Sequence, residues 1–541
     1  MIRIFRSRLL IPVILALGVV LIVTIARAAQ SNRKLNGTLP ALGDVVVALI
    51  SPDGQEVVYL ADQDLDEVFE LYSVKLDGSA APVKLNSPLA GAKDVVNFQI
   101  GPDSSRVVYL ADQDTTNKLE LYSVPIGGGA SVKLNGTLVT GGDVDEPSWR
   151  IGPDGSRVVY LADQDTNDVM ELYSVPAGGG SVVKLNVSLV AGGDVTGFQT
   201  SPDNSRVVYL ADRLIDEVYE LHSVPIDGGI TAKLNPLPVS GGDVIDFRIS
   251  PDSSRVVVMG DWRVDEVFEL GSVLLGGGSP VMLNGTLVSG GDVIDFRISP
   301  DSSRVVYQAD QDMDGVQELY SVPLDGGSPV KLNGPLVSNG TVFFAAFLIS
   351  PDSSRVVYNA DQDTDNVSEL YCVPLGGGSA VKLNGPLGNT GNVYSSFQIS
   401  PDSSRVVYRA DQDTDSVEEF YSAPLSGGNV VKLNGTLVSG GDVVFDFEIS
   451  PDSSRMVYRA DQDADEVYEL YGVPLAGGNV DKLNPALASG GGVSSGFHFS
   501  PDGSRVVYLA DQDTDDILEL YASDVASGDG GFKVYVPAVV R

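Results

Sequence analysis

The stretch Asp243-Val-Ile-Asp-Phe-Arg-Ile-Ser-Pro-Asp-Ser-Ser-Arg-Val-Val257 returns without a change as Asp292 to Val306. Its Pro-Asp pair occurs ten times at intervals of 49 to 51 residues, and no linker interrupts the series. The prolines of the ten copies are Pro52, Pro102, Pro153, Pro202, Pro251, Pro300, Pro351, Pro401, Pro451 and Pro501. A fixed period of this length indicates one structural unit stacked many times.

Each unit predicts four short strands. Residues 244–250 alternate between apolar and polar side chains, as a half-buried strand does, and the Pro-Asp turn follows. The next strand, for example residues 106–110, is apolar on both faces and therefore needs cover on both. An acidic loop, the strand 120–125, a glycine-rich turn and a short strand at 132–135 complete the unit.

Four strands joined by tight turns form a meander that cannot bury two apolar faces alone, whereas meanders stacked around an axis can. We therefore predict an all-β fold, a β-propeller of ten four-stranded antiparallel blades in one closed ring over residues 29–541. Two five-bladed rings are the alternative. Lys34-Leu35-Asn36 repeats the fourth-strand sequence before any first strand has appeared, so we expect the N-terminal segment to complete the tenth blade. Residues 532–534 are the rival for that place.

Residues 1–28 have the pattern of a secretion signal. Three arginines precede an apolar run at 9–25, and Ala26-Arg27-Ala28 offers the small residues that a signal peptidase requires. The run is close to the length that spans a bilayer, so an uncleaved membrane anchor is the alternative. Both alternatives predict an extracytoplasmic protein, whether secreted, periplasmic or at the cell surface.

The formal net charge of −38 excludes nucleic acid and anionic lipid as partners, because binding phosphates requires clustered Lys and Arg. Cations, or a basic protein or extracellular ligand, fit this charge better. A membrane would be contacted only through an uncleaved N-terminal segment. Cys372 is the only cysteine, so the fold must be stabilised by core burial rather than by disulfides.

The repeated sequence resembles that of a known family. Ser-Pro-Asp-Gly-Ser-Arg-Val-Val-Tyr at 500–508, together with Ala-Asp-Gln-Asp and Glu-Leu-Tyr, is similar to the WD-like propeller repeat of TolB-type exported bacterial proteins. The resemblance covers nearly all of residues 34–521 and implies a propeller. It does not imply one partner, because such repeats serve many functions. TolB itself has fewer blades and an additional N-terminal α/β domain that this chain lacks.

In an up-and-down meander, the acidic loop between the second and third strands lies at the same end of the ring as the connector between blades. Eight blades begin this loop with Asp-Gln-Asp. The loop at Asp310 also carries Asp312, Asp314 and Glu318, a spacing at which carboxylates can surround Ca²⁺. A solvated loop that keeps the protein soluble is the alternative. Calcium is the only cofactor that the sequence suggests.

Blades 4 and 5 break the acidic pattern. There Arg213, Leu214, Ile215, Trp262 and Arg263 stand in the acidic loops, and we expect these five residues to form one exposed patch. Trp and Arg frequently anchor protein interfaces, so the patch is the candidate partner-binding site, and neutral drift of a redundant loop is the alternative.

No catalytic constellation appears in the sequence. The chain has two histidines, neither with a metal-ligand partner nearby in sequence, and its carboxylates mostly belong to the repeat. We therefore expect a binding or scaffold propeller that is not an enzyme. A propeller glycosidase or lyase acting on an extracellular polymer is the alternative, because acid and base carboxylates can come from different blades.

Overall fold

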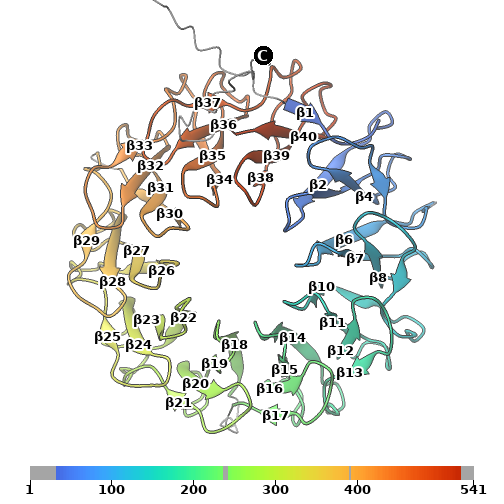
Figure 1. Ribbon diagram of the computed structural model, residues 1–541. Coiled ribbons are helices and arrows are strands. Elements are labelled where there is room, and N and C mark those ends of the chain that lie inside the picture. The colour runs from blue at the N-terminus through green and yellow to red at the C-terminus, as the bar shows by residue number, and fades with distance from the viewer. Residues whose placement is uncertain (1–31, 90, 236–241, 389–390, 526–541) are drawn as a thin grey trace, which may run out of the picture.

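The structure is a computed structural model that describes residues 32–89, 91–235, 242–388 and 391–525. All regular elements in these ranges are β-strands, arranged as ten four-stranded antiparallel sheets around one ring (Figure 1). No helix in the described ranges is long and apolar enough to cross a membrane. The signal sequence predicted at residues 1–28 lies outside the described residues.

The first strand of each blade lies nearest the centre of the ring (Figure 1). These strands are β2 (Val45–Ile50), β6 (Val95–Ile100), β10 (Val144–Ile151), β14 (Val195–Thr200), β18 (Val244–Ile249), β22 (Val293–Ile298), β26 (Val342–Ile349), β30 (Val393–Ile399), β34 (Val443–Ile449) and β38 (His498–Phe499). The second strands are β3 (Glu56–Ala61), β7 (Arg106–Ala111), β11 (Arg157–Ala162), β15 (Arg206–Ala211), β19 (Arg255–Gly260), β23 (Arg304–Ala309), β27 (Arg355–Ala360), β31 (Arg405–Ala410), β35 (Arg455–Ala460) and β39 (Arg505–Ala510).

The third and fourth strands complete each blade toward the outside. The third strands are β4 (Glu70–Lys75), β8 (Glu120–Pro125), β12 (Glu171–Pro176), β16 (Glu220–Pro225), β20 (Glu269–Leu274), β24 (Glu318–Pro323), β28 (Glu369–Pro374), β32 (Glu419–Pro424), β36 (Glu469–Pro474) and β40 (Glu519–Asp524). The fourth strands are β5 (Val83–Lys84), β9 (Val132–Lys133), β13 (Val183–Lys184), β17 (Ala232–Lys233), β21 (Val281–Met282), β25 (Val330–Lys331), β29 (Val381–Lys382), β33 (Val431–Lys432), β37 (Asp481–Lys482) and β1 (Asn32–Lys34).

The ring closes through its N-terminal strand, as the sequence predicts. β1 pairs antiparallel with β40, so that Asn32 is opposite Ser523 and Lys34 is opposite Tyr521. The backbone N–H of Leu35 continues the pairing by donating to the carbonyl of Leu520 at 2.8 Å. The tenth blade therefore contains both ends of the propeller sequence, and the ten blades form one ring rather than two. The rival segment, residues 532–534, lies outside the described residues.

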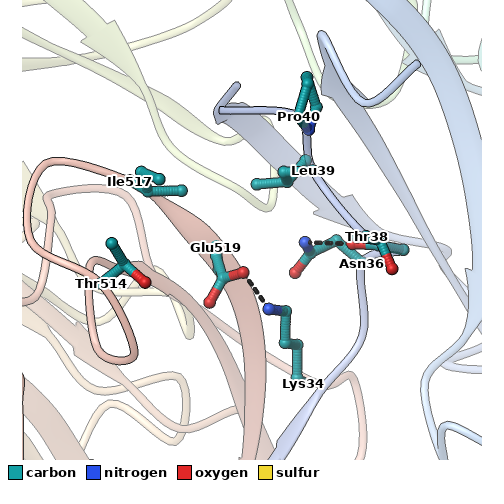
Figure 2. A pocket seen from close by; sticks show the side chains of 9 residues that line it. Lys34, Asn36, Thr38, Leu39, Pro40, Thr514, Ile517 and Glu519 are labelled. Carbon is teal, nitrogen blue, oxygen red and sulfur yellow. Dashed lines mark hydrogen bonds and ion pairs between the residues drawn. The ribbon is translucent and has the colours of Figure 1, made fainter. Parts of the chain in front are cut away.

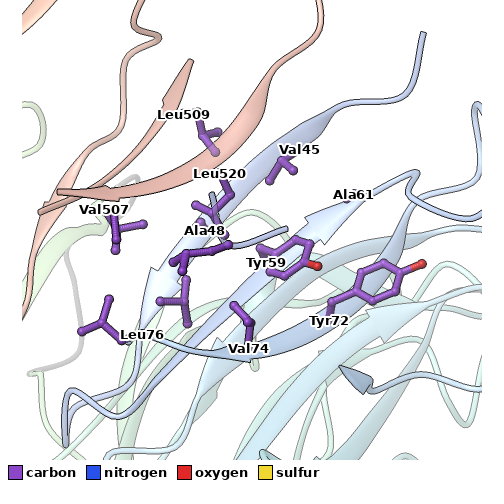
Figure 3. Close-up of a cluster of buried hydrophobic side chains, with 13 residues drawn as sticks. Val45, Ala48, Tyr59, Ala61, Tyr72, Val74, Leu76, Val507, Leu509 and Leu520 are labelled. Carbon is purple, nitrogen blue, oxygen red and sulfur yellow. The ribbon is translucent and has the colours of Figure 1, made fainter. Parts of the chain in front are cut away.

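The core lies between neighbouring blades. Figure 3 shows one such cluster, in which Val45, Tyr59 and Val74 of blade 1 meet Val507 and Leu520 of blade 10. Comparable clusters join the other blades around the ring. The second and third strands are apolar on both faces because each blade is covered by a neighbour on both sides.

Candidate functional site

The carboxylates proposed as a calcium site have separate structural partners. Asp310 accepts backbone N–H bonds from Asp292 with one oxygen and from Gly315 with the other. Lys331 Nζ lies 2.7 Å from Asp312 and 2.6 Å from Glu318. Although burial opposes it, hydrogen bonding to these two carboxylates raises the pKa of Lys331.

A calcium ion at this loop would have to displace a lysine from Asp312 and Glu318, and only Asp312 and Asp314 of the four carboxylates are exposed to solvent. Within residues 32–89, 91–235, 242–388 and 391–525, no group of three or more His, Cys, Asp and Glu side chains could hold a metal ion. The calcium site predicted from the sequence therefore lacks a ligand set in this geometry.

The same lysine arrangement recurs around the ring and belongs to the fold. In blade 10, Lys34 pairs with Glu519 at the base of a shallow hollow of about 500 Å³ that Leu39, Pro40 and Ile517 border (Figure 2). Equivalent hollows lie beside Lys331 and Lys432. Because the hollow and its ion pair are repeated, they do not single out one binding site.

The prediction that Trp262 lies on an exposed patch is wrong. Its side chain is only 4% exposed and packs in the core with Val256 and Val258. In other blades two stacked tyrosines fill this space, as Tyr59 and Tyr72 do with ring centroids 5.4 Å apart.

Blade 5 lacks both of these tyrosines. It has Val258 opposite Gly271 at the two positions, and a Cβ added at Gly271 would lie 2.5 Å from ring atoms of Trp262. Trp262 thus turns inward and replaces the missing tyrosine pair.

The rest of the predicted patch is more exposed. Leu214 and Ile215 are 56% and 62% exposed, while Arg213 is half-buried. The side chain of Arg263 is exposed, and its Nε is paired with Glu269 at 2.9 Å. The structure supports an exposed apolar surface in these loops, but without its expected aromatic anchor.

Sequence reasoning missed two further members of this surface. Val264 and Met313 are 58% and 62% exposed, and they occupy the same loop position as Ile215 in the next two blades. Five other blades have threonine there: Thr115, Thr166, Thr364, Thr414 and Thr514. We call Leu214, Ile215, Val264 and Met313 the apolar arc. Comparing the ten copies position by position would have revealed it.

Exposed apolar side chains gather at one end of the ring, which we call the acidic-loop face. It is formed by the acidic loops, the connectors between blades and the starts of the first strands. Thirteen of the twenty large apolar side chains that are exposed in the described ranges lie there: Leu42, Val46, Val47, Leu65, Leu214, Ile215, Ile245, Val264, Val288, Met313, Phe344, Val438 and Phe445. Five lie on outer fourth strands, and only Ile230 and Leu274 lie at the opposite end.

The inner strands of blades 3 and 7 to 10 depart from the repeat in a second way. In blade 5, only residue 245 lies unpaired between Val244 and Asp246. In blade 7, residues 343–346 separate the paired positions Val342 and Phe347 and form a bulge opposite a single residue, Asn359, and residues 145–148 of blade 3 form a bulge of the same size. Blades 8 and 9 have bulges of three residues, at 394–396 and 444–446. Blade 10 has three residues in the same place, at 494–496.

Polar side chains from the preceding blade bond to the bulged strands of blades 7, 8 and 10. One position of the second strand, which is Leu or Met in the other six blades, is Gln308, Asn359, Arg409 and Arg459 in blades 6 to 9. The Gln308 side chain donates to the carbonyls of Val342 and Phe343 at 2.8 and 3.2 Å and accepts from the backbone N–H of Ala345 at 3.0 Å.

Two of the other three polar side chains bond in the same direction. Asn359 and Arg459 donate to the carbonyls of Val393 and Val493, at 3.1 and 3.2 Å. A bulge leaves backbone groups without ladder partners, which these polar side chains satisfy in blades 7, 8 and 10, whereas the bulge of blade 3 follows a blade with Leu110 at that position.

The two arginines are neutralised within their own blades. Arg409 pairs with Glu418 at 2.6 Å and lies over the ring of Tyr394. Arg459 pairs with Asp446 at 2.8 Å and lies over Tyr468. Charges that are half-buried need such partners.

A smaller hollow of about 230 Å³ lies between β34 and β38 and is lined by residues 446–448 and 496–498. His498 Nδ1 lies 3.7 Å from Glu448 Oε2, and both side chains are partly exposed, at 45% and 36%. The other histidine, His222, is buried in blade 4 and stacks on Tyr209.

Comparison with known proteins supports a propeller family. A family model described as the lipoprotein LpqB beta-propeller domain (Gmad1) matches residues 74–224. No curated protein matches the chain.

Similar solved structures resemble the chain only weakly. One is an oligogalacturonate lyase in complex with manganese, with 15% identity and a TM-score of 0.33 over 61% of this chain and 88% of the other. Porphyromonas gingivalis dipeptidyl peptidase 4 has 11% identity and a TM-score of 0.44 over 67% of this chain and 56% of the other. A putative TolB from Agrobacterium tumefaciens has 19% identity and a TM-score of 0.26 over 47% and 89%. These values say nothing about activity, and the TolB-type resemblance stays a prediction while the broader propeller family is supported.

Proposed function

We propose that this protein is an extracytoplasmic binding or scaffold propeller whose acidic-loop face holds a protein or another extracellular ligand with basic and apolar groups. The observation that carries the proposal is the gathering of exposed apolar side chains on that face. Soluble proteins rarely expose contiguous apolar surface without using it. The formal net charge of −38 adds attraction for a basic partner and repulsion of acidic ones.

Two observations support the details of this proposal. The matching family model describes a lipoprotein propeller domain, which favours an envelope or other extracytoplasmic location. The repeated carboxylates are engaged in the fold, as Asp310, Asp312 and Glu318 illustrate, which favours binding over acid–base catalysis.

The test converts the apolar arc to the residue of the regular blades. The variant Ile215→Thr/Val264→Thr/Met313→Thr should recover at least tenfold less partner than the wild type in cross-linking capture from the native extracellular fraction. These positions are exposed, so folding should be unaffected. Leu65→Thr is the matched control, because Leu65 occupies the same loop position in blade 1 and is 54% exposed. Equal recovery by all three proteins would reject the arc as the binding surface.

A further inference from the structure

The bulges of blades 7 and 9 each carry an aromatic ring into the solvent. Phe344 and Phe445 are 71% and 66% exposed, although they belong to inner strands that pack against neighbouring blades. The residues at the place of Phe445 in blades 8 and 10 are Ser395 and Ser495, so nothing in the repeat requires a ring there. β26, β30, β34 and β38 follow one another along the inner edge of the ring (Figure 1). Exposed aromatic side chains are the usual anchors of interfaces.

The backbone that carries Phe344 is strained and held in place. Ala345 has a φ of 54°, in the left-handed region that residues with a side chain avoid. Its N–H donates to Gln308 and its carbonyl accepts from Arg297 at 3.3 Å. Strained residues that the surrounding structure fixes are concentrated at ligand sites. Phe344 is therefore presented by a bulge whose shape is set before any ligand arrives.

A partly exposed carboxylate, that of Glu448, lies three residues after Phe445 on β34. Asp446 and Glu418 are each paired with an arginine, but no lysine or arginine in the described ranges forms an ion pair with Glu448. Glu448 lies in the hollow between β34 and β38, whose lining includes Phe447 and Phe497. One of its oxygens accepts the backbone N–H of Phe499 at 3.2 Å. A cation entering this hollow would meet the Glu448 carboxylate above a floor formed by the buried Phe447 and Phe497, and a carboxylate suits lysine or arginine.

We propose that the inner wall of blades 7 to 10 binds a peptide segment of the partner in which a lysine or arginine stands next to one apolar side chain and a second apolar side chain lies farther along the segment. The basic side chain occupies the hollow at Glu448 between blades 9 and 10, the adjacent apolar side chain packs on Phe445 of blade 9, and the more distant one packs on Phe344 of blade 7. The formal net charge of −38 favours this occupant over an acidic one. The bulges interrupt the regular strand edge, so side chains rather than an added β-strand give the affinity. This inference rests on the proposed function and names the chemistry that the face recognises.

The probe is the peptide acetyl-Phe-Gly-Gly-Gly-Gly-Gly-Phe-Arg-Gly-amide, with versions in which Gln or Glu replaces Arg, titrated into the full-length protein by calorimetry. When extended, its two Phe residues are about 20 Å apart, which matches two blade spacings of about 10 Å each. The wild type should bind the Arg peptide at least tenfold more tightly than the Gln peptide and should not bind the Glu peptide. Phe344→Ser and Phe445→Ser should each weaken the Arg peptide about tenfold. Glu448→Gln should abolish the preference for Arg over Gln. Its fold should be unaffected, because Gln398 holds the same position in the preceding blade and bonds to the blade that follows it.

Two control variants separate this site from general surface effects. Ile245→Ser removes an inner-strand apolar side chain that is 46% exposed in blade 5, and Glu146→Gln removes an exposed inner-strand charge in blade 3. Both should bind the Arg peptide as the wild type does. Equal binding by the wild type and the Phe variants, equal binding of the Arg and Glu peptides, or no binding of any peptide would overturn the inference. If the apolar-arc variant alone loses its captured partner while Phe344→Ser and Phe445→Ser keep it, the proposed function stands and this inference fails.

Discussion

His222 stands at a third-strand position where eight of the ten blades have tyrosine. It is 1% exposed, stacks on Tyr209 and lies 3.5 Å from a carboxylate oxygen of Glu220. In blade 3, the equivalent Tyr173 donates its hydroxyl to Glu171 at 3.0 Å. Neither ring nitrogen of His222 has a hydrogen-bond partner among the described residues. The substitution therefore leaves a buried polar group that the repeat normally satisfies.

This histidine should make folding stability depend on pH. Burial lowers the pKa of His222 from 6.5 to about 4. Between these values the unfolded chain binds the proton and the folded protein does not, so stability falls as the pH drops from about 6.5 toward 4. Between pH 7.5 and pH 5 the loss should be on the order of 2 kcal/mol. Denaturant unfolding at both pH values should show that His222→Tyr removes this loss, whereas Tyr173→His introduces a second one. Identical pH profiles for all three proteins would contradict a neutral buried imidazole.

In blade 5, a loop residue compensates for two small residues on neighbouring strands. Trp262 fills the space that Val258 and Gly271 leave, so Trp262→Gln, which restores the usual residue, should cost about 3 kcal/mol by opening a cavity. Gly271→Ala should also destabilise the wild type, because its Cβ would press on the indole ring. In the Trp262→Gln background the same Gly271→Ala change should be nearly neutral. A double-mutant cycle by thermal unfolding would detect this coupling, and additive effects would disprove it.

The bulge of blade 7 offers a second test at the element scale. Gln308 is fully buried and satisfies three backbone groups of β26. Gln308→Leu restores the residue of the regular blades but leaves those groups unpaired, so we expect a loss of about 2 to 3 kcal/mol. Hydrogen exchange should accelerate at the Ala345 amide and stay unchanged in the bulge of blade 3. Unchanged exchange at Ala345 would show that Gln308 does not hold the bulge.

These elements show what the sequence can predict. Strand periodicity and the Pro-Asp turn predict every blade, because they depend on local physics that is repeated ten times. The burial of Trp262 could not be read from its own loop, because it depends on Val258 and on Gly271, which belongs to another strand. The bulge of blade 7 could not be predicted either, because the backbone groups that Gln308 satisfies belong to the following blade. In a repeat protein, the informative signals are residues that depart from the repeat together and that the fold brings into contact.

At the scale of the whole molecule, stability depends on closing the ring. β1 supplies Lys34, which pairs with the buried Glu519, and Asn36, two residues after β1, accepts the backbone N–H of Leu520 at 2.8 Å. Without β1, β40 would become an open edge, and the core between blades 1 and 10 would lose Leu35. Deleting residues 30 to 40 should therefore lower the unfolding midpoint far more than deleting residues 526 to 541. An unchanged midpoint would assign the closure to the C-terminal segment.

A finer comparison asks whether the closing blade is as strong as an ordinary one. Leu35 in blade 10 and Leu85 in blade 1 hold the same position after the fourth strand and are 3% and 1% exposed. Each donates its backbone N–H to the preceding third strand at 2.8 Å. If the closure is a full blade, Leu35→Ala and Leu85→Ala should each cost about 2 to 5 kcal/mol in denaturant unfolding. If the tenth blade instead opens before the rest of the ring, Leu35→Ala should hardly change the free energy of global unfolding. The amide of Leu35 would then exchange with solvent much faster than that of Leu85, because local opening would expose it without unfolding the other nine blades.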